Sequence, residues 1–580
     1  MTIYKNIDIF LSMLDHTNRY VIVGGVAAGA TAAARIRRLE ENAEIIVLER
    51  GSYVSFANCG LPYHISGDIE KRSKLILQTP EGFASRYRVT VKLHSEVIAL
   101  QPDQKQITLA SGETLSYDAL ILALGGSPVI PPIPGVNLPH VFKLWTIPDM
   151  DAINRYIKEN KPQRAVVVGG GFIGLETAEA FLKRGLQVSI VEMLDRLMPN
   201  LDPLYGRKIQ ERFEQEGARV LVSERVTAIE EKEVRLADGT ILPADLVLLS
   251  VGVRPNVQIA HQAGLTLGAT GALEVDEYLR TSDPFIWAAG DMIEVMHQVS
   301  GKKVRIPLAG PANRQGRIAA TNAVITLNPQ MGLRPQPYKG SLGTSVVKIL
   351  DATLAATGLS LEAAKKAGFD AREATILKTH HVTYYPGAED LLLTLIYDKD
   401  SGRILGATAY GKQGVEKRID AAAVAIYAGL TLEDLSALDF AYAPPYSAAN
   451  DPLNLVAFVA SNARSGYSPL VSAEDLEGVI GNSRNGFVEG KTVFLDVRTY
   501  GEYRKDHLAG AIHIPLDELR DRFDELSREK PLRIISTGGY EGHIASRQLL
   551  QKNFKDVANI SGGWAALRLV PGIPREKEEV

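Results

Sequence analysis

The one cysteine of this 580-residue chain lies in the stretch Ser55-Phe56-Ala57-Asn58-Cys59-Gly60-Leu61-Pro62-Tyr63. A thiol is usually a small buried hydrophobe, and it reacts only where its surroundings favour the thiolate. Position favours chemistry here, because the stretch follows a glycine-rich strand–turn–helix unit and its acid-ended second strand. One cysteine excludes an internal disulfide and a two-cysteine relay, so any disulfide made in turnover joins Cys59 to a second molecule. We expect Cys59 to be the reactive group.

The segment before Cys59 predicts a nucleotide-binding unit. A strand at residues 20–23 leads into Gly24-Gly25-Val26-Ala27-Ala28-Gly29 and a helix over 30–39, and a second strand over 44–48 ends at Glu49. Such glycines allow a tight turn and bring a pyrophosphate to the helix N-terminus, and the acid binds a ribose hydroxyl. Val26 replaces the middle glycine, so a glycine turn without a phosphate stays the alternative.

A second unit of the same kind has the full motif. The strand 165–168 leads into Gly169-Gly170-Gly171-Phe172-Ile173-Gly174-Leu175-Glu176, and the next strand, 188–191, ends at Glu192. A carboxylate there accepts a hydrogen bond from a free 2′-hydroxyl and repels a 2′-phosphate, which favours NADH over NADPH.

Two nested nucleotide-binding folds are the arrangement of a flavin enzyme that takes electrons from a nicotinamide. The hydrophobic strands 118–125 and 245–252 end in Gly125 and Gly252 and suit the crossovers between the two folds. Asp291 follows the strand 285–290, where it is available to the ribityl hydroxyls of a flavin. The alternative for Asp291 is a helix N-cap.

The pattern changes near residue 340. Strands at 345–350, 373–380 and 391–397 with helices around 361–367 and 415–428 predict an α+β unit of the kind that forms dimers, and it carries two turns in which tyrosines lie beside proline, 384–387 and 442–446. Such tyrosines are usually packing or turn residues. Residues 464–470 are predicted to be a linker, and the last hundred residues alternate strands (493–498, 511–515, 533–535) with helices, which indicates a parallel sheet.

Composition is that of an ordinary globular protein, with 45% hydrophobic and 23% charged residues and a net charge of −4. The mild negative charge argues against nucleic acid or an anionic membrane as partner. No apolar run approaches the roughly 18 residues of a membrane span. Residues 1–18 mix charged and apolar positions, so we expect a short extension rather than a signal peptide and a cytoplasmic protein, since a lone thiol suits a reducing compartment.

Residues 19–463 resemble the one-cysteine flavin disulfide reductases, most closely the coenzyme A-disulfide reductases and the related NADH-dependent persulfide reductases. The resemblance is carried by residues 24–29, Asn58-Cys59-Gly60-Leu61-Pro62-Tyr63, 169–176, Gly290-Asp291, 307–317 and the two tyrosine turns. It implies FAD, NADH (with NADPH as the other option) and coenzyme A as substrate or bound thiol. It also implies a homodimer whose subunits share active sites, and no metal.

The resemblance assigns site residues by position. Cys59 would form a mixed disulfide with coenzyme A, and Tyr384 and Tyr442 would reach its sulfur from the second subunit. The implied cofactor-binding residues are Gly24, Gly25, Ala28, Gly29, Glu49, Arg50, Val97, Gly125, Asp291, Asn313, Gly169, Gly171, Ile173, Gly174, Glu192 and Gly252. The implied coenzyme A-binding residues are Thr31, Arg35, Arg38, Ser55, Asn58 and Arg86.

Two positions depart from the family pattern, and both concern the binding of coenzyme A rather than the chemistry at Cys59. Tyr87, between Arg86 and Arg88, stands where a lysine is expected near the phosphates, and Asn450 replaces a lysine after the second tyrosine turn. For Arg35 and Arg38, a solvated helix face is the alternative to phosphate binding.

Residues 471–575 resemble a rhodanese domain through Asp496-Val497-Arg498, 507–511 and Gly562-Gly563-Trp564. The sulfur-carrying cysteine of rhodaneses aligns with Ser536, and a hydroxyl cannot hold a persulfide. An engineered cysteine-to-serine change is one explanation. Glu541, where the loop usually has arginine, favours a naturally inactive domain, because its charge repels anionic sulfur donors.

The sequence therefore predicts an α/β protein with nested Rossmann-like FAD and NAD(P)H domains, an α+β dimerisation domain and a rhodanese-like α/β domain. The expected boundaries are an extension at 1–18, the FAD domain at 19–127 and 265–339, the NAD(P)H domain at 128–264, the dimerisation domain at 340–463, a linker at 464–470 and the rhodanese-like domain at 471–580. The expected function is NAD(P)H-dependent reduction of coenzyme A disulfide, coenzyme A persulfide or polysulfide through Cys59. The alternatives are an NADH oxidase or peroxidase that works through a sulfenic acid, and a flavoprotein redox sensor whose tail only binds.

Overall fold

The computed structural model describes residues 17–476 and 492–578, so most of the expected N-terminal extension lies outside the described residues. The chain forms two compact units, residues 1–193 with 224–341 and residues 194–223 with 342–580. Each unit is described by itself below. No helix among the described residues is long and apolar enough to cross a bilayer.

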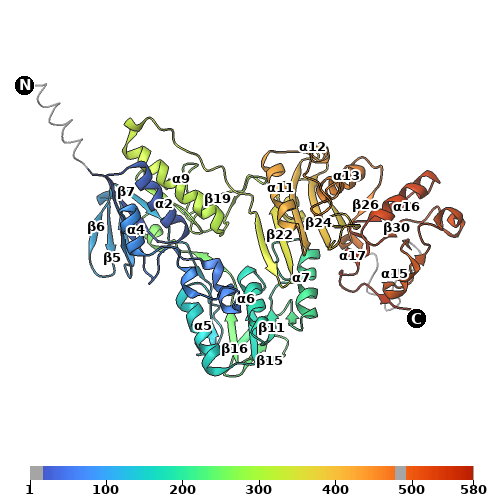
Figure 1. Cartoon of the computed structure of the whole chain (residues 1–580), viewed down its shortest axis with the longest axis horizontal. Helices are drawn as coiled ribbons and strands as arrows, with labels where there is room; N and C mark the ends of the chain where they lie inside the picture. The colour runs from blue at the N-terminus through green and yellow to red at the C-terminus, as the bar shows by residue number, and fades with distance from the viewer. Residues whose placement is uncertain (1–16, 477–491, 579–580) are drawn as a thin grey trace, which may run out of the picture. The chain divides into compact units, whose positions relative to one another are not determined.

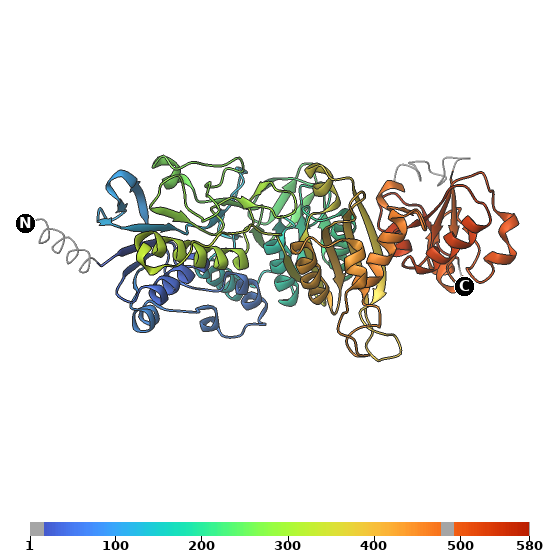
Figure 2. The same cartoon turned by 90° about the horizontal axis from the view of Figure 1, so that it is seen from above.

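The first unit contains a five-stranded sheet in the order β18-β7-β1-β2-β3. Its strands are β1 (Arg19–Val23), β2 (Glu44–Leu48), β3 (Thr90–Lys92), β7 (Ala119–Leu122) and β18 (Ile286–Ala288), and every pair is parallel. The apolar residues of β1, β2 and β7 are almost all fully buried, as expected for a sheet covered on both faces. The helices α2 (Ala27–Leu39) and α9 (Ala309–Leu327) lie side by side (Figures 1 and 2).

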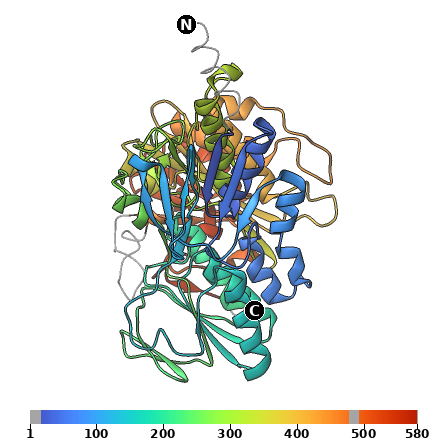
Figure 3. The same cartoon turned by 90° about the vertical axis from the view of Figure 1, so that its left-hand side faces the viewer.

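A second parallel sheet in this unit is centred on β10 (Arg164–Val168), which pairs with β11 (Gln187–Val191) and with β16 (Leu246–Leu249). β16 also pairs with β9 (Val141–Phe142), and α6 (Phe172–Lys183) packs on β10 and β11. The unit thus has the two nested nucleotide-binding folds that the sequence predicts. Figure 3 shows the elements of this unit in blue and green.

Smaller elements complete the first unit. They are α3 (Leu61–Ser66), α4 (Pro80–Tyr87), α5 (Ile147–Asn160), α8 (Gln258–Gln262), β4 (Val97–Gln101), β5 (Gln106–Leu109), β6 (Thr114–Ser116), β8 (Gly126–Pro128), β13 (Val226–Ile229), β14 (Glu233–Leu236), β15 (Ile241–Pro243), β17 (Val253–Pro255), β19 (Val295–Met296) and β20 (Lys303–Val304). The antiparallel pair β8–β17 joins the two glycine-ended crossovers, which the sequence placed at Gly125 and Gly252.

The second unit contains an antiparallel sheet in the order β21-β22-β25-β24-β23. Its strands are β21 (Ser345–Ile349), β22 (Ala352–Gly358), β23 (Ala371–Thr379), β24 (Asp390–Asp398) and β25 (Ile404–Gly411). The helices α11 (Val415–Tyr427) and α13 (Pro452–Arg464) pack on this sheet. The remaining elements of this part are α7 (Pro203–Gln215), β12 (Arg219–Leu221), α10 (Leu361–Ala367) and α12 (Leu432–Ala437).

The C-terminal part of the same unit has a second sheet, in the order β26-β31-β30-β27-β29. Its strands are β26 (Leu470–Val471), β27 (Val493–Asp496), β29 (Ile512–His513), β30 (Leu532–Ile535) and β31 (Val557–Ile560), and all pairs are parallel, as predicted. Helices α15 (Tyr500–Lys505), α16 (Tyr540–Gln551) and α17 (Gly563–Leu567) and the pair β28 (His507–Leu508) with β32 (Arg575–Glu576) complete it. The segment between α13 and β26 is shorter than the linker predicted at 464–470, because α13 ends at Arg464 and Leu470 already pairs with β31.

Candidate active site

The two glycine turns have matching backbone geometry. Gly24 and Gly169 have φ of +100° and +110°, and a Cβ on either would lie about 2 Å from a carbonyl oxygen of the neighbouring crossover. A Cβ on Gly29 or Gly174 would lie equally close to the carbonyl of the first glycine of its own turn. These positions therefore admit only glycine, and they bring each helix N-terminus close to the end of its strand.

The helix ends that follow these turns are suited to a pyrophosphate. Val26 precedes α2 and Gly171 precedes α6, and neither helix has a side-chain cap at its N-terminus. A Cβ on Gly171 would meet no atom within 4 Å, so the space over that turn is open in the described part of the chain. Unpaired N–H groups at a helix start bind anions, and the residues present fit a dinucleotide at each turn.

An acid follows the second strand of each fold and points back at the turn. Glu49 accepts hydrogen bonds from the N–H groups of Gly25, at 2.9 Å, and Gly51, at 2.7 Å. Glu192 accepts one from the N–H of Gly170 at 2.7 Å. Both carboxylates therefore lie where the ribose of a bound dinucleotide is expected.

Asp291 is a largely buried carboxyl beside the first fold. Burial raises its pKa to about 6, with no contribution from another side chain of the described residues. The residues after it form a turn, so the helix N-cap interpretation of Asp291 is wrong. A buried carboxylate suits a ligand with hydroxyl groups, as the ribityl chain of a flavin has, because it needs hydrogen-bond partners.

Cys59 lies in a single 3₁₀ turn, Asn58–Gly60, directly before α3, and it is exposed. Its pKa is raised, first by the desolvation that the surrounding chain imposes and then by the charges of Glu176 and Asp291. The chain's own groups therefore favour the thiol over the thiolate, and a lowered pKa at Cys59 requires a contribution from outside these groups.

Sequence reasoning missed the pair Tyr63 and Glu176. The Tyr63 hydroxyl donates a hydrogen bond to Oε1 of Glu176 at 3.0 Å, which joins α3 to α6. Burial raises the pKa of Glu176, and the hydrogen bond from Tyr63 opposes that rise. Tyr63 ends the cysteine motif and Glu176 ends the second glycine motif. Their location in these motifs is the one sequence signal that could have identified them as site residues.

The structure brings together several of the residues assigned to coenzyme A and flavin. Thr31 donates to Oδ1 of Asn313 at 2.7 Å, and Arg35 donates to Oγ1 of Thr321 at 3.0 Å, so α2 and α9 present these groups at one junction. Burial lowers the pKa of Arg35, and the positive charges of Arg317 and Arg38 lower it further. A cluster of like charges of this kind is stabilised by a bound anion.

The other assigned residues are placed individually. Ser55 has a left-handed backbone, with φ of +47°, and its N–H donates to the carbonyl of Gly25 at 2.8 Å. Asn58 donates to the carbonyl of Trp145 at 3.3 Å. Arg86 is exposed on α4. The remaining cofactor positions lie in the first fold or its crossovers (Ala28, Arg50, Val97, Gly125) or in the second fold (Ile173, Gly252).

The two tyrosine turns lie together in the second unit. The hydroxyls of Tyr384 and Tyr442 are 3.1 Å apart and hydrogen-bonded, although 58 residues separate them in sequence. Their exposed fractions are 73% and 46%. Exposed aromatic side chains of this kind suit an interface with another molecule.

Ser536 is fully buried at the end of β30, and its Oγ accepts a hydrogen bond from the N–H of Gly539 at 2.9 Å. The loop that it opens contacts the edge strand β23, where the N–H of Leu377 donates to the carbonyl of Gly538 at 3.2 Å. In the same strand, the N–H of Thr375 donates to Oγ of Ser561 at 2.8 Å, and its carbonyl accepts from the N–H of Gly562 at 2.9 Å. The loop is therefore attached to the edge strand of the dimerisation-type sheet.

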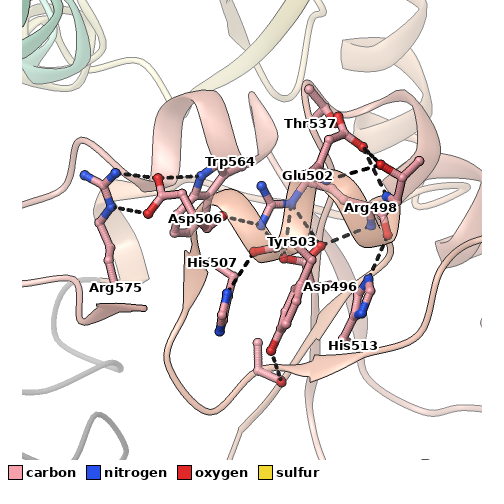
Figure 4. A network of polar contacts seen from close by, with 12 residues as sticks. Asp496, Arg498, Glu502, Tyr503, Asp506, His507, His513, Thr537, Trp564 and Arg575 are labelled. Carbon is pink, nitrogen blue, oxygen red and sulfur yellow. Dashed lines mark hydrogen bonds and ion pairs between the residues drawn. The ribbon is translucent and has the colours of Figure 1, made fainter. Parts of the chain in front are cut away.

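A network of polar contacts fixes this loop from the other side (Figure 4). Thr537 donates to Glu502 at 2.6 Å, and the buried Arg498 forms an ion pair with Asp496 at 2.6 Å and lies over the ring of Trp564. Such a network holds one loop conformation, because each buried charge is paired.

Comparison with known proteins agrees with these features. Residues 18–316 match the pyridine nucleotide-disulphide oxidoreductase family, residues 344–452 match the dimerisation domain of that family, and residues 484–569 match the rhodanese-like domain. The NAD(P)H sulfur oxidoreductase (CoA-dependent) of Pyrococcus abyssi is 37% identical over 444 residues, which cover 76% of this chain and 97% of that protein.

Two solved structures extend the likeness to nearly the whole chain, including its C-terminal part. The reduced CoADR-RHD protein of Bacillus anthracis is 41% identical, with a TM-score of 0.89 over 96% of this chain and 98% of that one. An NAD-dependent persulfide reductase from A. fulgidus is 35% identical, with a TM-score of 0.87 over 94% of this chain and 99% of that one. The chain therefore belongs to the pyridine nucleotide-disulphide oxidoreductase family and carries a rhodanese-like domain at its C-terminal end.

Proposed function

We propose that this protein is an NADH-dependent reductase of coenzyme A disulfide, coenzyme A persulfide or polysulfide that works through Cys59. The observation that carries the proposal is the single exposed thiol, which follows the glycine turn and second strand of the first nucleotide-binding fold and feels the charges of Glu176 and Asp291. The names of the relatives, a CoA-dependent sulfur oxidoreductase and a persulfide reductase, support the substrate class.

The residues present fit the two cofactors that this reaction needs. Gly24, Gly29, Glu49 and Asp291 would hold FAD, and residues 169–174 with Glu192 would hold NADH. A bound FAD supplies the two-electron carrier between the nicotinamide and the sulfur. The protein's part is to hold both dinucleotides at helix N-termini and to keep the thiol next to them.

The chain supplies the sulfur chemistry. The Cys59 thiolate attacks one sulfur of coenzyme A disulfide, so that a Cys59–coenzyme A disulfide forms as the substrate's sulfur–sulfur bond breaks and one coenzyme A thiolate leaves. Two electrons from NADH and a proton then restore the Cys59 thiolate and release the second coenzyme A as a thiol. Because burial, Glu176 and Asp291 raise the pKa of Cys59, we expect the rate of attack to increase with pH.

The leaving thiolates need a proton donor and an anion site. We propose that Tyr384 and Tyr442 of the second subunit of a homodimer donate that proton, since their hydroxyls already lie together and exposed. The phosphates of coenzyme A would lie against Arg35 and Arg38 on α2. A thiol that must stay reduced suits a reducing compartment, and we place the reaction in the cytoplasm.

The decisive experiment uses Cys59→Ser in the full-length protein with FAD bound. NADH should still bleach the flavin absorbance without oxygen, whereas turnover of coenzyme A disulfide should be lost; turnover that persists in the variant rules the proposal out. Intact mass of the wild type, before and after a reductant, should show a reducible coenzyme A adduct. One added oxygen instead, with rapid oxygen consumption, would indicate the oxidase or peroxidase function.

A further inference from the structure

One buried ion pair lies beneath the two tyrosine turns. Arg418 on α11 contacts Asp451, the N-cap of α13, with Nη2 and Oδ2 2.9 Å apart, and both side chains are 1% exposed. Removing two charges from water is costly, and a well-packed apolar replacement is often equally stable. Because stability alone does not explain this pair, its value lies in the geometry that it imposes.

Arg418 holds the base of the first turn. Its guanidinium donates to the carbonyl of His380 at 2.7 Å and to that of Gly414 at 3.0 Å. A Cβ on Gly414 would lie 2.1 Å from Nη1 of Arg418, so only glycine leaves space for the guanidinium in this position. His380 is the residue after β23, and the segment from there to β24 carries Tyr384.

Asp451 holds the base of the second turn. Ser447, which is fully buried, donates from Oγ to Oδ2 of Asp451 at 2.7 Å. The carbonyl of Ser447 accepts from the N–H of Val382 at 3.2 Å, which joins the two turns directly. Lys417 is the other cation near Asp451, with 3.9 Å between Nζ and Oδ2.

The tyrosine side chains themselves are not held by packing. Tyr384 and Tyr442 are exposed, and the hydrogen bond between their hydroxyls is their one polar contact among the described residues. The backbones that carry these hydroxyls are held at the base of the turns, where Arg418, Ser447 and Asp451 connect them.

We propose that Arg418 is a positioning residue that, through Asp451, sets the meeting of the Tyr384 and Tyr442 hydroxyls and so controls proton delivery to the coenzyme A thiolate. The inference rests on the proposed function, which assigns the tyrosines to that step. A displacement of about 1 Å in a proton donor costs on the order of 10- to 100-fold in rate. Lysine keeps the charge of Arg418 but cannot reach Asp451 and both carbonyls at once.

The test compares Arg418→Lys with Arg464→Lys in the full-length, FAD-loaded protein. Arg464 is a matched control, since it also bonds two carbonyls, those of Lys399 and Asp400, and one carboxylate, that of Glu433. We expect NADH to reduce the flavin at an unchanged rate in both variants. Turnover of coenzyme A disulfide should fall about 10- to 100-fold in kcat in Arg418→Lys alone.

Introducing Arg418→Lys into a protein that lacks both turn tyrosines separates positioning from general damage. In a Tyr384→Phe/Tyr442→Phe protein, Arg418→Lys should cause no further loss of kcat. In the native background, it should make kcat depend less steeply on pH at the alkaline end of the pH profile. Additive losses, or wild-type turnover in Arg418→Lys, overturn the inference. If the Arg418→Lys protein does not form the dimer, Ser447→Ala tests the same connection between the turns. We expect a several-fold loss of kcat in Ser447→Ala, and an unchanged kcat would contradict the inference. A wild type that reduces its flavin but not coenzyme A disulfide would instead refute the proposed function.

Discussion

The hydroxyl of Tyr63 is hydrogen-bonded to Oε1 of Glu176 at 3.0 Å, and the charge of Glu176, after burial, contributes most to the raised pKa of the Cys59 thiol. The contact connects the helix that follows the cysteine to the helix that begins at the second glycine turn. A charge on the nicotinamide-binding fold thus acts on the sulfur that the other fold carries.

Replacing Glu176 by Gln should lower the pKa of Cys59. Removal of a neighbouring negative charge favours the thiolate, while the amide still accepts the hydrogen bond from Tyr63. Between pH 7 and 9, iodoacetamide should alkylate Cys59 several-fold faster in Glu176→Gln than in the wild type. The rate should also reach its plateau at a lower pH than in the wild type. Glu179→Gln, one turn further on α6, is the control. An unchanged pH profile in Glu176→Gln would show that its charge does not act on the thiol.

Glu192 should determine the preference for NADH. Its carboxylate lies at the glycine turn, and the next residues, Met193 and Leu194, are exposed and carry no charge for a 2′-phosphate. Glu192→Gln should raise KM for NADH by roughly tenfold and narrow the gap to NADPH, because the amide no longer repels a phosphate. Steady-state kinetics with both nucleotides measure this, and equal losses for both would contradict the role.

Ser536→Cys should not restore sulfurtransferase activity. Position 536 is fully buried, the following loop is bonded to β23 through Gly538, and Glu541 adds a negative charge. A thiol at residue 536 would therefore be out of reach of an anionic sulfur donor such as thiosulfate. Thiosulfate consumption with cyanide as acceptor should stay at the level of the unchanged protein, and a gain of turnover would mean that the loop opens.

The second unit should become less stable as pH rises through neutrality. A cavity of about 40 Å³ beside α7 and β23 is lined by the carboxyl groups of Asp202, Glu373 and Glu474. Burial, together with neighbouring acids, raises the pKa of Asp202 to about 6 and that of Glu373 to about 7, although Ser472 donates a hydrogen bond to Glu373 at 2.6 Å.

Both pKa values lie above the unfolded values of about 4, so the folded state binds more protons. Their contribution to stability is complete below about pH 4 and is lost as pH rises through 6 and 7. Glu373→Gln should therefore flatten the decline in Tm between pH 5 and 8.5 and stabilise the protein by on the order of 1–3 kcal/mol at the alkaline end. Glu416→Gln on the exposed surface of α11 is the control. An identical pH dependence in Glu373→Gln and wild type would exclude Glu373 as the group that titrates.

Several elements followed from local sequence alone. The strand 44–48 and the helix 361–367 have the predicted bounds, because buried strands and short capped helices are encoded by nearby residues. The two glycine turns were also predictable, since close backbone approach excludes every side chain. β22 and β25 were missed, because their alanine- and glycine-rich sequences have little strand propensity and depend on pairing with neighbours.

The sequence by itself determined the family, the nested folds, the single thiol at residue 59 and the absence of a sulfur-carrying group at residue 536. Only the tertiary structure decided which groups act on one another: Glu176 on Cys59, Tyr384 with Tyr442, Arg418 beneath both turns. These contacts join residues 33 to 117 positions apart, and their burial and charge depend on which surfaces the fold brings together. A linear motif records residue types and spacing, whereas pKa values and hydrogen bonds are set by distances that chain topology fixes.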